Sequence, residues 1–435
     1  MKSMYKFIAT ALFLLASPVL TWASSLTLDQ CIEHGLAFNP QITAYRLSIE
    51  EAEEGIYEAW GSFLPTLSAD YNYNQLTNSG SANLDRDYLS SDSQSFQIRL
   101  SQPLFTGMAG MAGLKKARES QTYREYELRL VQQQLIREIR ISFNDILLQE
   151  QLIEKWTESI ERLENQQEIA KAWVAQDLAP RLRLLEIVVE LSNARQSLVS
   201  AEAALAIAEA KLKQWLALHP EEPFSIEGSL QQSVSANCDV IGSCLEWALH
   251  QRPELKLTDL NVAMAHEDAK LIRARNLPQA SFAASWNDYE REFDDSRLDK
   301  EIRDYYTLSL NLSVKPFQGG KNIFAYRKQL LTIKRLQQER IKQKSSIVTE
   351  VKTRFELFLS GISLLDASKK GVEEANEAYN FAARSAKLGV LSLKDLLNAE
   401  LRLTQTEISK INAEHALQVS QVHLNYAMGD AASQL

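Results

Sequence analysis

Histidine, cysteine and acidic side chains carry most of the metal and acid–base chemistry of proteins. This chain has six histidines, and none has the spacing of a metal-ligand motif: His34, His219, His250, His266, His415 and His423. The sequence also contains no Gly-rich phosphate loop and no nucleophile motif. We therefore expect no catalytic activity, no cofactor and no resident metal.

The three cysteines leave two arrangements open. Cys238 and Cys244 are close enough in sequence to form a disulfide in an oxidising compartment. Cys31 and Cys244 also occupy equivalent positions of an internal repeat, described below, where a small buried thiol would pack well. A Cys238–Cys244 disulfide and three packed free thiols are therefore alternatives.

Charge and hydropathy limit the location of the protein. The formal net charge of −9 at pH 7 makes nucleic acid an unfavourable partner. Lys2 and Lys6 precede an apolar run and a small residue before Ser24, which predicts a secretory signal peptide over residues 1–23. No later stretch approaches the roughly 18 apolar residues of a transmembrane helix, so any membrane crossing would use strands.

The chain contains two copies of one pattern. Pro40 and Pro65 have the same separation as Pro253 and Pro278, and the same shift aligns Cys31 with Cys244. Copies of about 200 residues indicate a duplicated domain rather than a short-period solenoid. The expected organisation is the signal peptide 1–23, a first repeat 24–218, an inter-repeat equatorial segment 219–241, a second repeat 242–429 and a C-terminal tail 430–435.

Each copy changes from a helical period to a period of two at a proline. Apolar and polar residues alternate after these prolines, which predicts strands over about 66–75, 94–103, 279–289 and 305–315. The polar segments between the paired strands are interpreted as solvated loops. Glycines after the second strand of each copy permit a turn into a helix. The expected strand-to-helix junctions are Pro65, Gly107, Pro278, Gly319 and Gly320.

The longest predicted elements are two proline-free helices, about 108–175 and 321–387, each roughly 100 Å long. Their apolar residues advance in alternating steps of three and four, which is the spacing of a coiled coil. A shorter antiparallel partner follows each one, about 180–218 and 392–428. The predicted fold is mainly α, with long helical hairpins and a small β part.

Four strands are too few for a closed outer-membrane barrel, because such single-chain barrels have at least eight. Several copies of the chain would therefore have to pool their strands. Three copies would supply twelve strands, which is enough for a barrel wider than one that side chains fill.

In order, spacing and duplication, these segments resemble the TolC-like outer membrane efflux proteins, or outer membrane factors. The resemblance covers residues 26–429 and includes "LTLDQCIEHGLAFNP", "GSCLEWALHQRPEL", "PLFTG", "PFQGGK" and "AKLGVLSLKDLLNAELRL". It implies a homotrimer with a 12-strand barrel in outer-membrane lipid and a long periplasmic α-barrel. It also implies an exit duct for efflux or type I secretion, which works with a periplasmic adaptor (membrane fusion) protein and an inner-membrane transporter.

The turn "LGVLS" is similar to the family's Gly-x-x-Ser tip, which implies that the adaptor contacts Leu388, Gly389, Leu391 and Ser392. Helix capping is the alternative explanation, because glycine permits a left-handed C-cap and serine is a favoured N-cap. The first repeat has Asp177 and Pro180 in place of the glycine and the serine. The two halves therefore differ at this turn.

Members of this family have acids one helical turn apart at the closed periplasmic entrance. Asp395 matches the first of these positions, and Asn398 stands at the second. Arg183 and Glu186 occupy the equivalent positions of the first repeat. The resemblance thus implies a gate formed by these four residues, and a solvated polar helix face is the alternative.

A periplasmic coiled-coil scaffold is the second function that the sequence permits. It would explain the long helices but would give no role to the four alternating strands. A scaffold would remain soluble without detergent, whereas a channel would not.

Overall fold

The computed structural model describes residues 25–77, 90–230, 240–293, 299–388 and 390–430. The predicted signal peptide, residues 231–239 of the inter-repeat segment and residues 431–435 of the tail lie outside this part of the chain. The chain divides into two compact units, which are described separately. A helical unit contains residues up to Ile42, Val131–Gln251 and residues from Ile347 onward, and a sheet unit contains Thr43–Leu130 and Arg252–Ser346.

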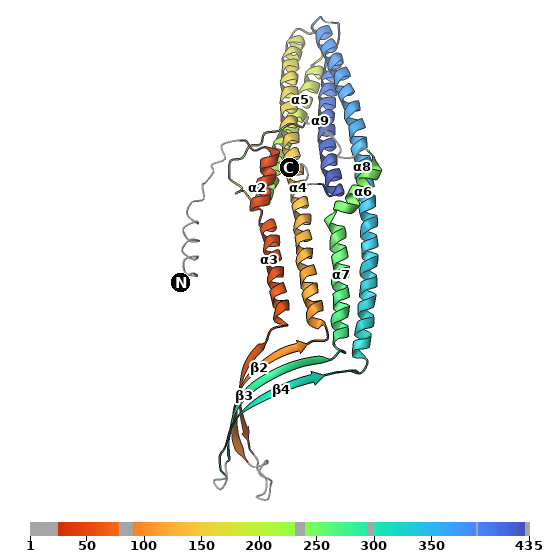
Figure 1. Cartoon of the computed structure of the whole chain (residues 1–435). Helices are drawn as coiled ribbons and strands as arrows, with labels where there is room; N and C mark the ends of the chain where they lie inside the picture. The colour runs from red at the N-terminus through yellow and green to blue at the C-terminus, as the bar shows by residue number, and fades with distance from the viewer. Residues whose placement is uncertain (1–24, 78–89, 231–239, 294–298, 389, 431–435) are drawn as a thin grey trace. The chain divides into compact units, whose positions relative to one another are not determined.

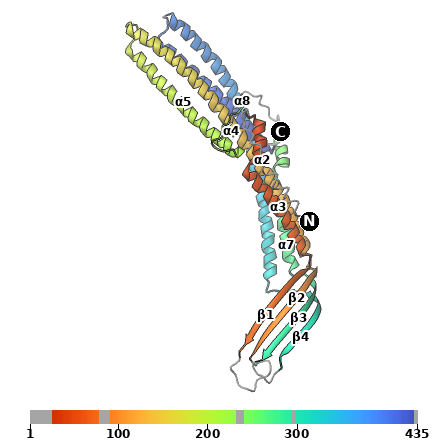
Figure 2. The same cartoon turned by 90° about the vertical axis from the view of Figure 1, so that its left-hand side faces the viewer.

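The sheet unit is built on four antiparallel strands in the order β1-β2-β3-β4 (Figures 1 and 2). The strands are β1 (Thr66–Leu76), β2 (Ser91–Phe105), β3 (Gln279–Phe293) and β4 (Glu301–Ser313). Each repeat contributes one pair, and β2 and β3 join the two pairs. Within the sheet, β1 and β4 are the edge strands, so each has a neighbour on one side only.

The two faces of this sheet differ in polarity. Leu67 lies opposite Leu100, and Ala284 lies opposite both Leu100 and Leu308, so these side chains share one face. We call it the apolar face; it contains Leu67, Ala69, Tyr71, Tyr73, Phe96, Ile98, Leu100, Phe282, Ala284, Trp286, Tyr306, Leu308, Leu310 and Leu312. Leu67 and Leu310 are each 72% exposed. The other face carries serine, asparagine, glutamine and charged side chains.

The strands extend beyond the alternating segments from which they were predicted. β2 begins at Ser91, β3 continues to Phe293, and β4 begins at Glu301. The expectation that residues 91–93, 291–293 and 301–304 belong to solvated loops was therefore wrong. Ladder hydrogen bonds are formed by the backbone, so a hairpin continues where both faces are polar and the alternation is lost.

Helices α3 (Pro40–Gly61) and α7 (Pro253–Ala274) accompany the first parts of α4 (Ala109–Ala175) and α8 (Lys321–Lys387) in this unit. Lys116 of α4 pairs with Asp268 of α7 at 2.7 Å, and Gln329 of α8 donates to the Ala265 carbonyl at 2.9 Å. The layer of helices runs α3-α4-α7-α8 (Figure 1). α4 and α7 are therefore central, and α3 and α8 are outer.

The residues expected at the junctions all lie between a strand and a helix. Pro65 and Pro278 each immediately precede a strand, and Gly107, Gly319 and Gly320 lie between a strand and the following long helix. All three glycines have positive φ, and Met108 beside Gly107 has φ 70°. A Cβ at Gly107 would lie 2.8 Å from the Ala274 carbonyl oxygen, so this turn requires glycine for two reasons.

The helical unit contains α2 (Leu28–Phe38), α5 (Arg181–Leu216), α6 (Ile241–Gln251) and α9 (Leu393–Met428), with the later parts of α4 and α8. The order of elements in the first half of the chain is thus repeated in the second. The predicted seam of α4 is buried at Ile139, Ile146 and Leu163. On α8 the coiled-coil spacing predicts burial of Val351, Phe355, Phe358 and Ile362; the first three are buried, whereas Ile362 is 44% exposed.

Cys31 is a buried free thiol in the helical unit, and burial raises its pKa to about 12. Cys244 is disulfide-bonded, so the alternative of three packed free thiols was wrong. Cys238 itself lies outside the described residues.

Among the described residues, no helix is both long enough and apolar enough to cross a membrane.

We expect Gly107→Ala to lower the free energy of unfolding by about 1–3 kcal/mol, because the new Cβ is both strained and too close to the end of α7. Gly319→Ala is the matched control for strain alone, since its Cβ would meet no atom within 4 Å. Gly113→Ala, in open space on α4, should be neutral or stabilising. Thermal unfolding of the purified variants measures the difference, and equal losses for Gly107→Ala and Gly319→Ala would contradict the close-packing argument.

Candidate functional site

Two helical hairpins end in short turns within the helical unit. The first turn joins α4 to α5, and Asp177 takes the left-handed conformation there, with φ 55°. The Leu178 amide donates to the Trp173 carbonyl at 2.9 Å, which closes the end of α4 in the manner of a Schellman motif. The second turn shows the same bond at 2.9 Å between the Val390 amide and the Ser385 carbonyl. The two turns therefore end their long helices in the same way.

Ser392 is the N-cap of α9. Its hydroxyl oxygen accepts the Asp395 amide at 3.3 Å, and the same hydroxyl donates to the Asp395 carboxylate at 2.6 Å. Asp395 also lies in the first turn of α9, where a negative charge is favourable. The capping explanation of Ser392 thus has direct geometric support. Gly389 lies outside the described residues.

The exposed side chains of these turns are mostly apolar. Leu388 and Val390 of the second turn are 79% and 78% exposed, and Leu178 of the first is 67% exposed. Leu391 is half-buried. Exposed aliphatic side chains on a loop that is already closed by backbone bonds are available to a partner protein.

The four predicted gate residues lie on α5 and α9. Arg183 and Glu186 form an ion pair at 2.7 Å within α5, so each compensates the other's charge. Asp395 and Asn398 are exposed on α9. Among the described residues, Asp395 is hydrogen-bonded to Ser392, and no bond joins it to the α5 pair. The gate assignment of these four residues stays a prediction.

A buried polar cluster, which sequence reasoning missed, lies between α4 and α9. Glu400 of α9 is 0% exposed, and Arg162 of α4 donates through Nε to both of its carboxylate oxygens at 2.9 and 2.8 Å. Ser159 donates to the same carboxylate at 3.1 Å, and Thr404 Oγ1 lies 3.0 Å from it. Arg162 Nη2 also reaches Glu407 at 3.4 Å. We call these five residues the Arg162 cluster.

The electrostatics of the Arg162 cluster favour a paired cation. Burial alone would lower the pKa of Arg162, but Glu400 and Glu407 outweigh that effect and the pKa is raised. Burial raises the pKa of Glu407, although Arg162 opposes the shift. The guanidinium of Arg162 therefore links one fully buried carboxylate of α9 to α4. Removing Arg162 would leave a buried negative charge, and removing Glu400 would leave the guanidinium without its main acceptor.

The sequence does contain a signal for this cluster. Leu393, Leu396, Leu397 and Leu403 form the buried stripe of α9, and Glu400 lies within it at the same helical spacing. An acid at a seam position is expensive unless a base from another helix reaches it. The equivalent position of the first repeat is Val188, so the ion pair has no counterpart there. The difference between Val188 in the first repeat and Glu400 in the second was the sequence signal for a buried ion pair.

A cavity of about 650 Å³ lies beside the Arg162 cluster. Its walls include Arg162, Trp173, Tyr379 and the buried side chain of Gln166. Neither amide atom of Gln166 has a hydrogen-bond partner among the described residues. In the same part of the chain no group of three or more His, Cys, Asp or Glu side chains is arranged to hold a metal ion.

Comparison with known proteins places this fold. The family model of outer membrane efflux proteins matches residues 32–218 and again residues 244–430. The chain belongs to the outer membrane efflux protein family. This membership assigns it to the outer membrane and to a family of channel proteins rather than enzymes.

Individual relatives agree with the family assignment. The outer membrane efflux protein BepC of Brucella suis is 22% identical over 434 residues, covering 98% of this chain and 90% of BepC. The CmeC outer membrane channel of Campylobacter jejuni superimposes with a TM-score of 0.79 at 13% identity, covering 93% of this chain and 86% of CmeC. VceC of Vibrio cholerae has a TM-score of 0.75 at 14% identity, covering 92% and 96%. At such identities the structural matches establish the fold alone.

We expect Arg162→Met to destabilise this efflux protein by about 3–5 kcal/mol, because it leaves Glu400 buried without its cation. Arg162→Met combined with Glu400→Met should recover most of the loss, since both charges are then absent. Arg195→Met is the control, because it breaks the exposed Arg195–Glu164 pair and should cost at most about 1 kcal/mol. Thermal unfolding of the two single variants and the double variant measures these losses of stability. A loss in the double variant equal to the sum of the losses of Arg162→Met and Glu400→Met would refute the pairing.

Proposed function

We propose that three copies of this chain form an outer-membrane channel that continues as a helical tunnel into the periplasm. The channel is the exit duct of a tripartite efflux or type I secretion system, with a periplasmic adaptor and an inner-membrane transporter as partners. The observation that carries the proposal is the four-stranded sheet with one exposed apolar face and two edge strands. Membership of the outer membrane efflux protein family supports it.

The sheet has the properties of part of a membrane barrel wall. Hydrocarbon favours the apolar face, and the opposite polar face suits a water-filled lumen. A sheet edge cannot remain open in hydrocarbon, because each unpaired backbone group costs several kcal/mol. Pairing β1 of one copy with β4 of the next satisfies both edges. Three copies then supply twelve strands.

The outer helices of each unit support lateral association. In the sheet unit, large apolar side chains are exposed on the outer helices, including Leu47 and Trp60 of α3 and Phe324 and Leu331 of α8. In the helical unit, α5 and α8 expose a further set: Leu182, Leu185, Val188, Val189, Val199, Ile207, Leu357, Leu359, Ile362, Leu364 and Phe381. Exposed apolar stripes of this size are typical of interfaces. A ring of copies would bury them.

A periplasmic scaffold is less well supported. Such a protein would gain nothing from the apolar face, which in water would promote aggregation through the exposed edges. Dependence on detergent distinguishes the two functions.

The entrance is the proposed place of contact with the adaptor. Leu388, Val390 and Leu391 form an apolar tip to which a helical hairpin of the adaptor could bind, and Ser392 fixes the start of α9 behind them.

A threefold axis would bring three copies of Asp395 together, and their negative charge would favour cations at a narrow entrance. We expect Asp395→Asn to lower the preference for cations, measured as ion selectivity in planar bilayers, because it removes these negative charges. Unchanged selectivity would assign Asp395 to helix capping alone.

We expect Leu310→Arg to prevent stable assembly in the outer membrane, because a lipid-facing arginine near mid-membrane costs about 2–4 kcal/mol per copy. Asn311→Arg is the matched control on the opposite face of the same strand, where water would solvate the charge. Membrane fractionation and chemical cross-linking in mild detergent measure the outcome. Equal assembly of both variants, or a monomer that stays soluble without detergent, would reject the channel.

We expect Leu388→Glu to reduce export at least about tenfold while assembly is preserved, because a charge replaces an exposed apolar contact at the tip. Leu178→Glu, which changes an exposed aliphatic side chain of the first turn, is the control and should export normally if only the second hairpin docks. Export assays in a deletion strain, with adaptor co-purification, measure both. Normal export by Leu388→Glu would exclude this turn as the docking site.

A further inference from the structure

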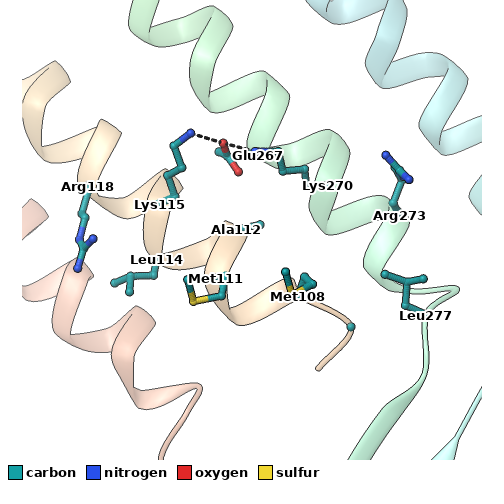
Figure 3. Close-up of a pocket in the computed structure, with 11 residues that line it drawn as sticks. Met108, Met111, Ala112, Leu114, Lys115, Arg118, Glu267, Lys270, Arg273 and Leu277 are labelled. Atoms are coloured by element: carbon teal, nitrogen blue, oxygen red, sulfur yellow. Dashed lines mark hydrogen bonds and ion pairs between the residues drawn. The ribbon is translucent and has the colours of Figure 1, made fainter. Parts of the chain in front are cut away.

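A groove in the sheet unit lies between the first turns of α4 and the last turns of α7. It encloses about 550 Å³, and Figure 3 shows the side chains that line it. Met108, Met111, Leu114 and Leu277 provide apolar walls. Met108 and Met111 are 60% and 59% exposed, so two flexible thioethers face outward from the start of a long helix. We call it the α4–α7 groove.

Basic side chains surround these apolar walls. Lys115 and Arg118 come from α4, and Lys270 and Arg273 come from α7. The acid among the lining residues is Glu267, which is buried and pairs with Lys115 at 3.0 Å and with Lys270 at 2.8 Å. A second carboxylate, that of Glu119, also pairs with Lys115 at 3.7 Å. Four cations against these two carboxylates leave the α4–α7 groove with a net positive charge.

The two arginines differ from the lysines in their partners. Glu267 pairs with both lysines, and the hydrogen bond from Lys115 to Glu267 is the main reason why the pKa of Lys115 is raised. Arg118 and Arg273 have no acceptor among the described residues. Figure 3 shows Arg118 on the α4 side and Arg273 on the α7 side of the α4–α7 groove. Their guanidinium groups can bind phosphate oxygens in a bidentate manner.

We propose that the α4–α7 groove binds the headgroup and adjoining acyl chain of an anionic phospholipid. Gly107 and Met108 immediately follow β2, and Leu277 immediately precedes the Pro278–β3 junction. The α4–α7 groove thus begins where the sheet with the apolar face ends. This placement rests on the proposed membrane location of that sheet.

The lining favours a lipid over a free anion. Inorganic phosphate would satisfy the arginines but would leave the methionine and leucine walls in contact with water. An acyl chain covers these walls, and each buried methylene contributes to affinity. α4 and α7 are the central helices of their layer, so neighbouring copies meeting at α3 or α8 would not cover the α4–α7 groove.

The test uses native mass spectrometry of the full chain purified in detergent. Phosphatidylglycerol and phosphatidylethanolamine with identical acyl chains are added separately, and inorganic phosphate is added as a third probe. We expect phosphatidylglycerol to bind about tenfold more tightly than phosphatidylethanolamine. Arg118→Gln combined with Arg273→Gln should weaken phosphatidylglycerol binding about tenfold.

Arg327→Gln combined with Arg335→Gln is the matched control, since it removes two exposed arginines of α8 in the same unit and should leave lipid binding unchanged. Equal binding of the two lipids, or equal effects of the two double variants, would overturn the proposal. Phosphate binding that competes with the lipid at equal concentration would assign the site to a free anion instead. Because binding is read on purified protein, failed adaptor docking would abolish export without changing this result.

Discussion

The need to hydrogen-bond every strand backbone group determines how this chain can function. Its sheet has two edges, and a face of leucine, tyrosine and phenylalanine that water does not favour. In hydrocarbon an open edge is prohibitively costly, so a membrane location and self-association become one requirement. The same requirement explains the duplication. Two hairpins per chain give an even set of antiparallel strands, and in the proposed channel β1 and β4 pair between copies.

The helices meet a different constraint. A helix of 67 residues satisfies its own backbone, but it can bury only one stripe, and α4 and α8 both have this length. In α4 that stripe faces its hairpin partner and α9. The Arg162 cluster crosses this apolar contact with a buried ion pair, which adds little net stability but fixes which helices meet and in what register. The two hairpins of one chain are joined there by a bond that depends on a single carboxylate.

Much of the fold could be predicted because the residues that end its helices and form its turns act locally in the sequence. Pro65 and Pro278 stop helices, and Gly107 permits a backbone turn that no other residue would make without strain. The polar ends of β2, β3 and β4 could not be predicted, because their pairing is a backbone property without a side-chain signal. The Arg162 cluster was missed for a related reason. An acid in an apolar stripe is recognisable, but its partner on α4 is 238 residues away in sequence, and the fold alone brings the two together.

The differences between the two copies indicate where their roles diverge. Position for position, the first hairpin has Asp177, Arg183 and Val188 where the second has Gly389, Asp395 and Glu400. The first hairpin's arginine is neutralised within its own helix by Glu186, whereas Asp395 is bonded to the serine that begins α9. The second hairpin therefore starts with a fixed cap, exposes its aliphatic tip, and is held from behind by Arg162 of the first. A pull on the tip of the second hairpin would be transmitted along α9 to Glu400. Among the described residues, the buried pair is the polar contact between the two hairpins that lies nearest this tip, so it opposes independent movement of the second hairpin.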